Sequence, residues 1–119
     1  MNDAQVTIWH NPRCSKSRQG LKLLEDAGVT PQVVSYLDTP PSAQELDRVL
    51  TTLGFEPRQL MRTKEPLYRE LGLDNTQLGR QELLLAMAAN PKLIERPIVL
   101  KGNRVALGRP PEKVLDVLA

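Results

Sequence analysis

The pattern of hydrophobic and β-branched residues near the start of the chain predicts a strand, a helix and a second strand. The first strand covers Gln5–His10 and is closed by an Asn-Pro pair. A helix is predicted over Ser15–Ala27, because leucines recur along one side and Gly28, a common helix stop, follows directly. A second strand is predicted over Gln32–Leu37. Such a β-α-β unit indicates two parallel strands joined by a right-handed crossover.

The middle of the chain has the spacing of helices. Ser42 and Glu45 form a capping-box pattern, because the serine oxygen can accept the N–H three residues on and the glutamate can bond back. Hydrophobic residues then recur at helical spacing as far as Leu53. Further helical segments are expected at residues 58–62, 66–71 and 80–89. We therefore expect a helical insertion over about residues 42–90.

Strand patterns return at Pro97–Leu100 and Arg104–Leu107, separated by glycine and asparagine as in a tight hairpin. A Pro-Pro pair then opens a last helix whose buried stripe is expected at Val114, Leu115 and Leu118. The element order is that of an α/β, thioredoxin-like domain, in which a four-stranded mixed sheet carries helices. The insertion lies between the β-α-β and β-β-α halves, and we expect one domain over residues 1–119.

Composition narrows the possible functions. The 119 residues are 40% hydrophobic and 25% charged, which argues against a disordered chain. A net charge of +2 and an aromatic content of 3% argue against nucleic acid as a partner. No apolar run is long enough to span a membrane and no secretory signal is visible, so we expect a cytoplasmic protein. A single cysteine excludes an internal disulfide and a thiolate-rich metal site.

The single cysteine, Cys14, falls where the first strand gives way to the first helix. The N–H groups and the dipole at a helix N-terminus favour a thiolate, and Arg13, Lys16 and Arg18 add positive charge. The same features favour binding of an oxyanion. A nucleophile and an anion site are therefore predicted to coincide at Cys14.

Spacing excludes two familiar kinds of cysteine site. A phosphatase-type loop needs an arginine six residues after the cysteine, where this chain has Gly20. A dithiol motif needs a second cysteine at the position of Ser17, so any redox cycle needs a thiol from another molecule. The Ser17 hydroxyl either bonds the thiolate or is solvated. His10, the one histidine, either steers protons and supports the thiolate or is a strand-end residue with a satisfied ring.

Two arginines are predicted to lie near Cys14. Arg96 precedes the first strand of the hairpin and Arg109 follows the second, so antiparallel pairing brings them to one end of the sheet. In a thioredoxin-like sheet Cys14 emerges at this same end, and the guanidinium group is suited to gripping oxyanions. The Arg96-Pro97 peptide resembles the one before the cis-proline loop of that fold, although its isomer stays open. Nothing in the spacing places Arg62 near Cys14.

Separated motifs resemble a known family. They are His-Asn-Pro-x-Cys-x-x-Ser-Arg from residue 10, Tyr-Leu-x-Thr-Pro-Pro from residue 36, Met-Arg-Thr-Lys-Glu from residue 61, Arg-Pro-Ile-Val from residue 96, and Gly-Arg-Pro from residue 108. Together they are similar to the glutaredoxin-coupled arsenate reductases of bacteria. The resemblance implies a catalytic cysteine at Cys14 and three arginines at Arg62, Arg96 and Arg109. It also implies that His10 and Ser17 support the thiolate.

The resemblance further implies a reaction. The thiolate attacks arsenate to give a thioarsenate adduct, which glutathione and glutaredoxin resolve with release of arsenite. Glutathione is then a co-substrate, and no tightly bound cofactor is expected. The chain ends at Ala119 without the C-terminal tail of plasmid-encoded members, and so resembles a short chromosomal branch. Two alternatives stay open: a glutaredoxin-like thiol oxidoreductase acting on another substrate, and a non-catalytic redox regulator that binds RNA polymerase.

Overall fold

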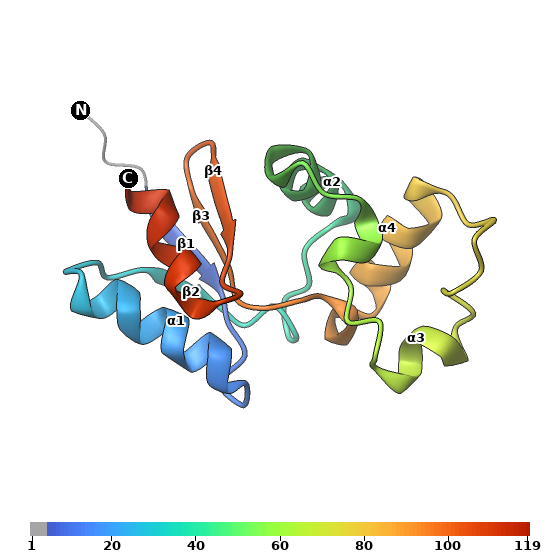
Figure 1. Ribbon diagram of the computed structural model, residues 1–119, viewed down its shortest axis with the longest axis horizontal. Helices are drawn as coiled ribbons and strands as arrows, with labels where there is room; N and C mark the ends of the chain where they lie inside the picture. The colour runs from blue at the N-terminus through green and yellow to red at the C-terminus, as the bar shows by residue number, and fades with distance from the viewer. Residues whose placement is uncertain (1–4) are drawn as a thin grey trace. The chain divides into compact units, whose positions relative to one another are not determined.

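One mixed sheet of four strands organises the part of the chain that carries Cys14, as a computed structural model describing residues 5–119 shows (Figure 1). The strands are β1 (Val6–Trp9), β2 (Gln32–Val34), β3 (Ile98–Lys101) and β4 (Arg104–Leu107), in the spatial order β2-β1-β3-β4. β1 pairs parallel with β2 and antiparallel with β3, and β3 pairs antiparallel with β4. The mixed α/β sheet expected from the sequence is therefore confirmed.

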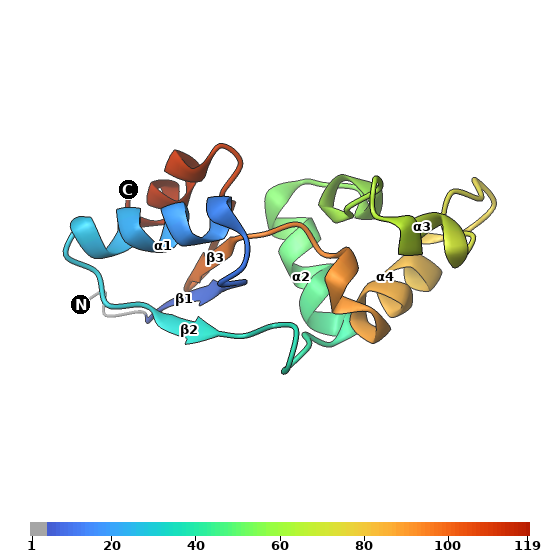
Figure 2. The ribbon, with the colours of Figure 1, turned by 90° about the horizontal axis from the view of Figure 1, so that it is seen from below.

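Helices cover one face of this sheet. α1 (Ser15–Asp26) and the 3₁₀ helix η3 (Pro111–Leu118) pack together against it (Figures 1 and 2). Ile8, Val99 and Ala106 are paired in register across three strands and form a row under the two helices. The buried core consists of Val6, Ile8, Leu24, Val99, Ala106, Val114 and Val117. This core fixes α1, and with it Cys14, against the sheet.

The strand register brings three chain segments to one edge of the sheet. Trp9, the last residue of β1, pairs with Ile98, the first residue of β3, and Ile98 pairs with Leu107, the last residue of β4. The residues that leave β1, enter β3 and leave β4 therefore lie at the same edge. These are the segments that carry the residues predicted to be functional.

The chain forms two compact units. The first combines residues up to Thr39 with Arg96–Ala119 and contains the sheet, and the second, Pro40–Glu95, is helical. Its helices are α2 (Ala43–Leu53), η1 (Pro57–Leu60), α3 (Pro66–Glu70), α4 (Arg80–Ala89) and η2 (Pro91–Leu93). The capping box is present: Ser42 Oγ accepts the Glu45 N–H at 3.1 Å, and Glu45 Oε1 accepts the Ser42 N–H at 3.0 Å. That the whole chain forms one domain with an insertion stays a prediction.

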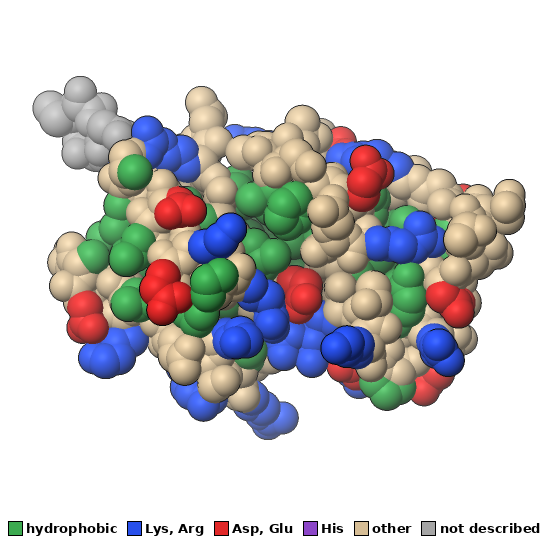
Figure 3. Space-filling model, viewed as in Figure 1, with side chains coloured by type: hydrophobic (Ala, Val, Ile, Leu, Met, Phe, Trp, Pro, Cys, Tyr) green, Lys and Arg blue, Asp and Glu red, His purple; other side chains and the backbone are tan. Residues whose placement is uncertain are grey.

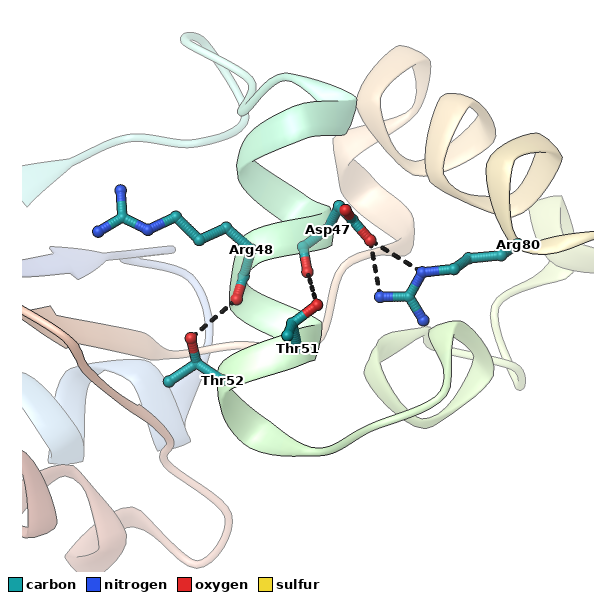
Figure 4. Close-up of polar contacts among 5 residues, drawn as sticks. All are labelled: Asp47, Arg48, Thr51, Thr52 and Arg80. Carbon is teal, nitrogen blue, oxygen red and sulfur yellow. Dashed lines mark hydrogen bonds and ion pairs between the residues drawn. The ribbon is translucent and has the colours of Figure 1, made fainter.

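An ion pair joins two helices of the second unit (Figure 4). Nε and Nη2 of Arg80, the first residue of α4, lie 2.8 and 2.7 Å from Oδ1 of Asp47 on α2. Further along α2, the hydroxyl of Thr51 donates to the carbonyl of Asp47, and the hydroxyl of Thr52 donates to the carbonyl of Arg48. Polar groups thus link the exposed sides of these helices, while Leu46, Leu50, Leu83 and Met87 are buried.

Two predicted elements differ from those observed. β2 ends at Val34 rather than continuing to Leu37, because the Ser35 carbonyl accepts the N–H groups of Asp38 and Thr39 and turns the chain. The last helix is 3₁₀, and its buried residues are Pro111, Val114 and Val117. Their spacing of three matches the three residues per turn of a 3₁₀ helix, whereas Leu115 and Leu118, predicted as buried, are only partly so.

The face of the molecule drawn in Figure 3 agrees with the mixed charge of the composition. Figure 3 shows basic and acidic side chains interspersed with polar and hydrophobic ones. Within residues 5–119, no helix combines the length and apolarity needed to cross a membrane. The expectation about a secretory signal falls on the start of the chain, of which residues 1–4 lie outside the described part.

Candidate active site

Cys14 is the N-cap residue of α1. Its backbone is extended, with φ −98° and ψ 122°, and its carbonyl accepts the first helical bond from the N–H of Arg18 at 3.0 Å. A turn delivers the chain to this position, since Asn11 accepts the Cys14 N–H through its carbonyl and the Arg13 N–H through Oδ1, each at 3.0 Å. The thiol is neither buried nor fully exposed. It therefore adjoins the unpaired amides of the helix start and remains reachable.

Three effects determine the pKa of the Cys14 thiol. Partial burial raises it, while the backbone N–H groups of Ser17 and Lys16 and the charge and hydrogen bond of Arg96 lower it. The lowering effects win, so the pKa lies below its ordinary value of 9.0. Backbone amides at a helix start and a guanidinium both favour the charged form of sulfur. The thiolate predicted from the position of Cys14 thus has identifiable partners.

The Ser17 hydroxyl is buried and ties the helix to the end of β1. Its relative exposure is 0%, which excludes the solvated surface position considered from the sequence. Oγ accepts the Asn11 N–H at 3.0 Å and lies 2.7 Å from Nδ1 of His10. The contribution of Ser17 to the thiolate comes from its backbone N–H. The side chain therefore holds the turn that presents Cys14.

His10 is itself buried, with 8% relative exposure. Burial lowers its pKa from 6.5, the charge of Arg18 lowers it further, and Glu25 opposes with a smaller upward effect. The ring is therefore neutral at pH 7, and Nδ1 can accept the Ser17 hydroxyl hydrogen. The structure places His10 in the same hydrogen-bonded group as Ser17, beside the turn leading to Cys14. A catalytic role for this histidine stays a prediction.

Arg96 and Arg109 lie at the sheet edge predicted for them. Arg96 precedes β3 and Arg109 follows β4, each within two residues of the paired Ile98 and Leu107. Both side chains are half-buried. The peptide bonds Arg96-Pro97 and Arg109-Pro110 are both cis, which answers the question left open for the first. The charge of Arg96 and a hydrogen bond from its side chain lower the pKa of the Cys14 thiol, so the structure brings these two predicted residues together.

Arg62 belongs to the second unit, where a local network holds it. Nη1 lies 3.4 Å from Oε2 of Glu65 and 3.4 Å from the carbonyl oxygen of Lys92. Nζ of Lys92 lies 3.1 Å from Oε1 of the same glutamate, whose side chain is only 14% exposed. Glu65 was not predicted from the sequence as a partner of Arg62, although a spacing of three residues between opposite charges is typical of an ion pair. The catalytic role of Arg62 stays a prediction.

Comparison with known proteins places the chain in a family. A protein-family model described as the ArsC family matches residues 9–117 of the sequence, and this range includes every predicted site residue. The chain belongs to the ArsC family. A solved structure of an arsenate reductase from Vibrio cholerae matches this ArsC protein with a TM-score of 0.93 and 53% identity, covering 98% of this chain and 99% of that one. This likeness confirms the thioredoxin-like fold predicted from the sequence.

Curated relatives of this ArsC chain carry different descriptions. An arsenate reductase from Neisseria meningitidis serogroup A is 51% identical over 115 residues, which are 96% of this chain and 98% of the relative. YfgD from Escherichia coli K12, described as uncharacterized, is 52% identical over 115 residues, covering 96% and 97%. Similarity over nearly the full length therefore links this chain to proteins named for arsenate reduction and to one with no assigned activity.

Proposed function

We propose that this ArsC family protein is an arsenate reductase in which the Cys14 thiolate is the nucleophile. The observation that carries the proposal is the placement of Cys14 at the start of α1, where helix amides and Arg96 lower the pKa of its thiol. Relatives of about half-identical sequence bear the name arsenate reductase, which supports arsenate as the substrate. An anionic substrate suits a site whose fixed charges are arginines at one sheet edge.

The first chemical step forms a bond between sulfur and arsenic. The sulfur lone pair of Cys14 attacks As(V) of arsenate, and an arsenate oxygen leaves as water after taking up protons. Arsenic remains pentavalent in the resulting Cys14 thioarsenate adduct. A thiolate is required because the neutral thiol is a poor nucleophile. Positive charge is required because the attacking sulfur and the arsenate oxyanion repel each other.

The second step transfers two electrons to arsenic. Glutathione thiolate attacks the Cys14 sulfur, the S–As bond breaks with its electron pair going to arsenic, and arsenite leaves. The remaining Cys14–glutathione disulfide is opened by a glutaredoxin thiolate, which takes the glutathione and returns Cys14 as thiolate. An external thiol is necessary because Cys14 is the only cysteine in the chain. Glutathione is thus a co-substrate, and the cycle needs no tightly bound cofactor.

Each arginine is assigned a different negative group of the reaction to stabilise. Arg96 interacts with the sulfur in the resting site. Arg109 lies at the same edge, at the end of β4, where it can bind arsenate oxygens bidentately. Arg62 is assigned to the adduct by family resemblance. Removing one preorganised donor of this kind commonly costs on the order of 100-fold or more in rate. Arg96→Ala and Arg109→Ala should each show such a loss while remaining folded.

An assay of arsenite release with purified protein, arsenate, glutathione and glutaredoxin tests the proposal. The wild-type chain should turn over, Cys14→Ser should be inactive, and Ser15→Ala, a change at the neighbouring exposed residue, should retain activity. Activity of Cys14→Ser near that of the wild type would refute the nucleophile. Turnover of a glutathione mixed disulfide without any arsenite release would instead assign the glutaredoxin-like alternative.

A further inference from the structure

The ring of Pro97 lies against two glycines. A β-carbon placed on Gly108 would be 2.7 Å from Cγ of Pro97 and 2.8 Å from Cγ1 of Val114. A β-carbon placed on Gly20 would be 3.0 Å from Cγ of Pro97 and 3.1 Å from Cγ1 of Val114. Ordinary van der Waals contact begins near 3.5 Å, so no side chain fits at Gly108, and one fits at Gly20 only if its neighbours shift.

These contacts join the three segments that carry the site. Gly20 lies on α1, the helix that Cys14 caps. Pro97 directly follows Arg96, and Gly108 directly precedes Arg109. The Gly108 N–H also donates to the Pro97 carbonyl at 2.9 Å. The Pro97 ring therefore touches the helix of the cysteine on one side and the neighbour of the second arginine on the other.

We propose that the Gly20–Pro97–Gly108 contact is a positioning device that sets where Arg96 and Arg109 stand relative to Cys14. Missing side chains at both glycines let the Pro97 loop approach α1 and β4 closely. A β-carbon at either position pushes the ring away, and the displacement passes to the adjoining arginine through one peptide bond. Sites of this kind tolerate errors of only about 0.5 Å. The inference deepens the proposed function and rests on it for the role of the arginines.

The test compares three variants. Gly108→Ala makes the shortest contact, and Gly20→Ala makes a milder one while gaining about 1 kcal/mol of helix propensity, which favours a folded product. Val117→Ala is the matched control, because it removes buried volume from the same core one turn beyond Val114. Urea unfolding reports the stability of each protein. The pH profile of Cys14 alkylation by iodoacetamide reports the surroundings of the sulfur without any arsenate.

We expect Gly108→Ala to raise the midpoint of the alkylation profile the most and Gly20→Ala to raise it less. Where the midpoint lies above the pH of the measurement, each further unit of rise slows alkylation at that pH roughly ten-fold. Both variants should lose kcat/KM for arsenate, whereas Val117→Ala should lose stability and keep the wild-type midpoint. If Gly108→Ala does not fold, the folded Gly20→Ala decides the question.

Two results would overturn the positioning role. One is a wild-type alkylation midpoint in every folded glycine variant. The other is an equal shift in Val117→Ala, which would mean that any loss of core packing moves the site. Both differ from a failure of the proposed function, which would appear as the absence of arsenite release from the wild-type protein.

Discussion

Replacing Ser17 with alanine tests the buried hydrogen bonds that hold the turn before Cys14. The hydroxyl accepts the Asn11 N–H at 3.0 Å and lies 2.7 Å from Nδ1 of His10. Both bonds join residues at the end of β1 to the first turn of α1. The Ser17 side chain is wholly buried, so no water reaches the position that its hydroxyl occupies. Ser17→Ala therefore leaves two polar groups without a partner.

The magnitude follows from counting those groups. A buried donor or acceptor left unsatisfied costs about 1–3 kcal/mol, so two cost about 2–6 kcal/mol. Alanine returns up to about 0.5 kcal/mol through its higher helix propensity. Because Asn11 is only half-buried, a small movement of its N–H toward solvent recovers part of the loss, and we expect a net loss of about 1–4 kcal/mol. This corresponds to a change of about 5- to 700-fold in the folding equilibrium.

Urea unfolding of Ser17→Ala beside Ser15→Ala measures the effect. Ser15 is exposed on the same first turn of α1, so its substitution carries a similar propensity change without loss of a buried bond. A double-mutant cycle with His10→Ala should give a coupling energy of about 0.5–3 kcal/mol. If Ser17→Ala and Ser15→Ala differ by less than about 0.5 kcal/mol, the hydroxyl does not hold the turn and the reasoning fails.

Three further outcomes are expected. Arg96→Gln should raise the midpoint of Cys14 alkylation with pH, because it removes a charge and a hydrogen bond that favour the thiolate. The free energy of unfolding should fall as pH drops through about 6.5. Burial and the charge of Arg18 lower the pKa of His10 in the folded state, so the unfolded chain takes up the proton first. The free energy of unfolding then changes by at most about 1.4 kcal/mol per pH unit. His10→Gln should remove the part of this slope that is centred near pH 6.5, in urea midpoints taken between about pH 5.5 and 7, since the chain has one histidine. Ser42→Ala should cost about 1 kcal/mol in urea unfolding by removing the cap of α2, whereas Thr30→Ala in an exposed loop should not.

Local signals in the sequence located most elements of the fold. The capping box at Ser42 and the glycine turn at Gly102 both have one dominant structural solution, and both occur as predicted. The form of the last helix was not predictable in this way. Residues 114, 115 and 118 suit an α-helix, but packing against the sheet selects residues spaced by three, beginning at Pro111. Tertiary contacts chose between two periodicities that the sequence allows.

The sheet edge that gathers Arg96 and Arg109 could be predicted because it follows from strand direction alone. The partner of the Ser17 side chain could not. A serine one turn after a cysteine can reach the sulfur, the solvent or the preceding strand, and only the path of residues 11–14 decides among them. Neither strand direction nor local spacing could predict a role for Arg62, since no local pattern relates the helical unit to Cys14. Family resemblance alone connects it to the reaction.

Gly20 occupies a position in α1 for which the sequence alone offers no structural reason. Its identity excludes a phosphatase-type loop, which needs an arginine at that position. Sequence gives no positive reason for a glycine inside a helix, where it costs about 1 kcal/mol relative to alanine. Contact with Pro97, seventy-seven residues further along the chain, supplies that reason, because a β-carbon at Gly20 would meet the proline ring at 3.0 Å. A helix-weakening residue in the helix that Cys14 caps is therefore best explained by what must approach the helix there, and here that is the segment carrying Arg96.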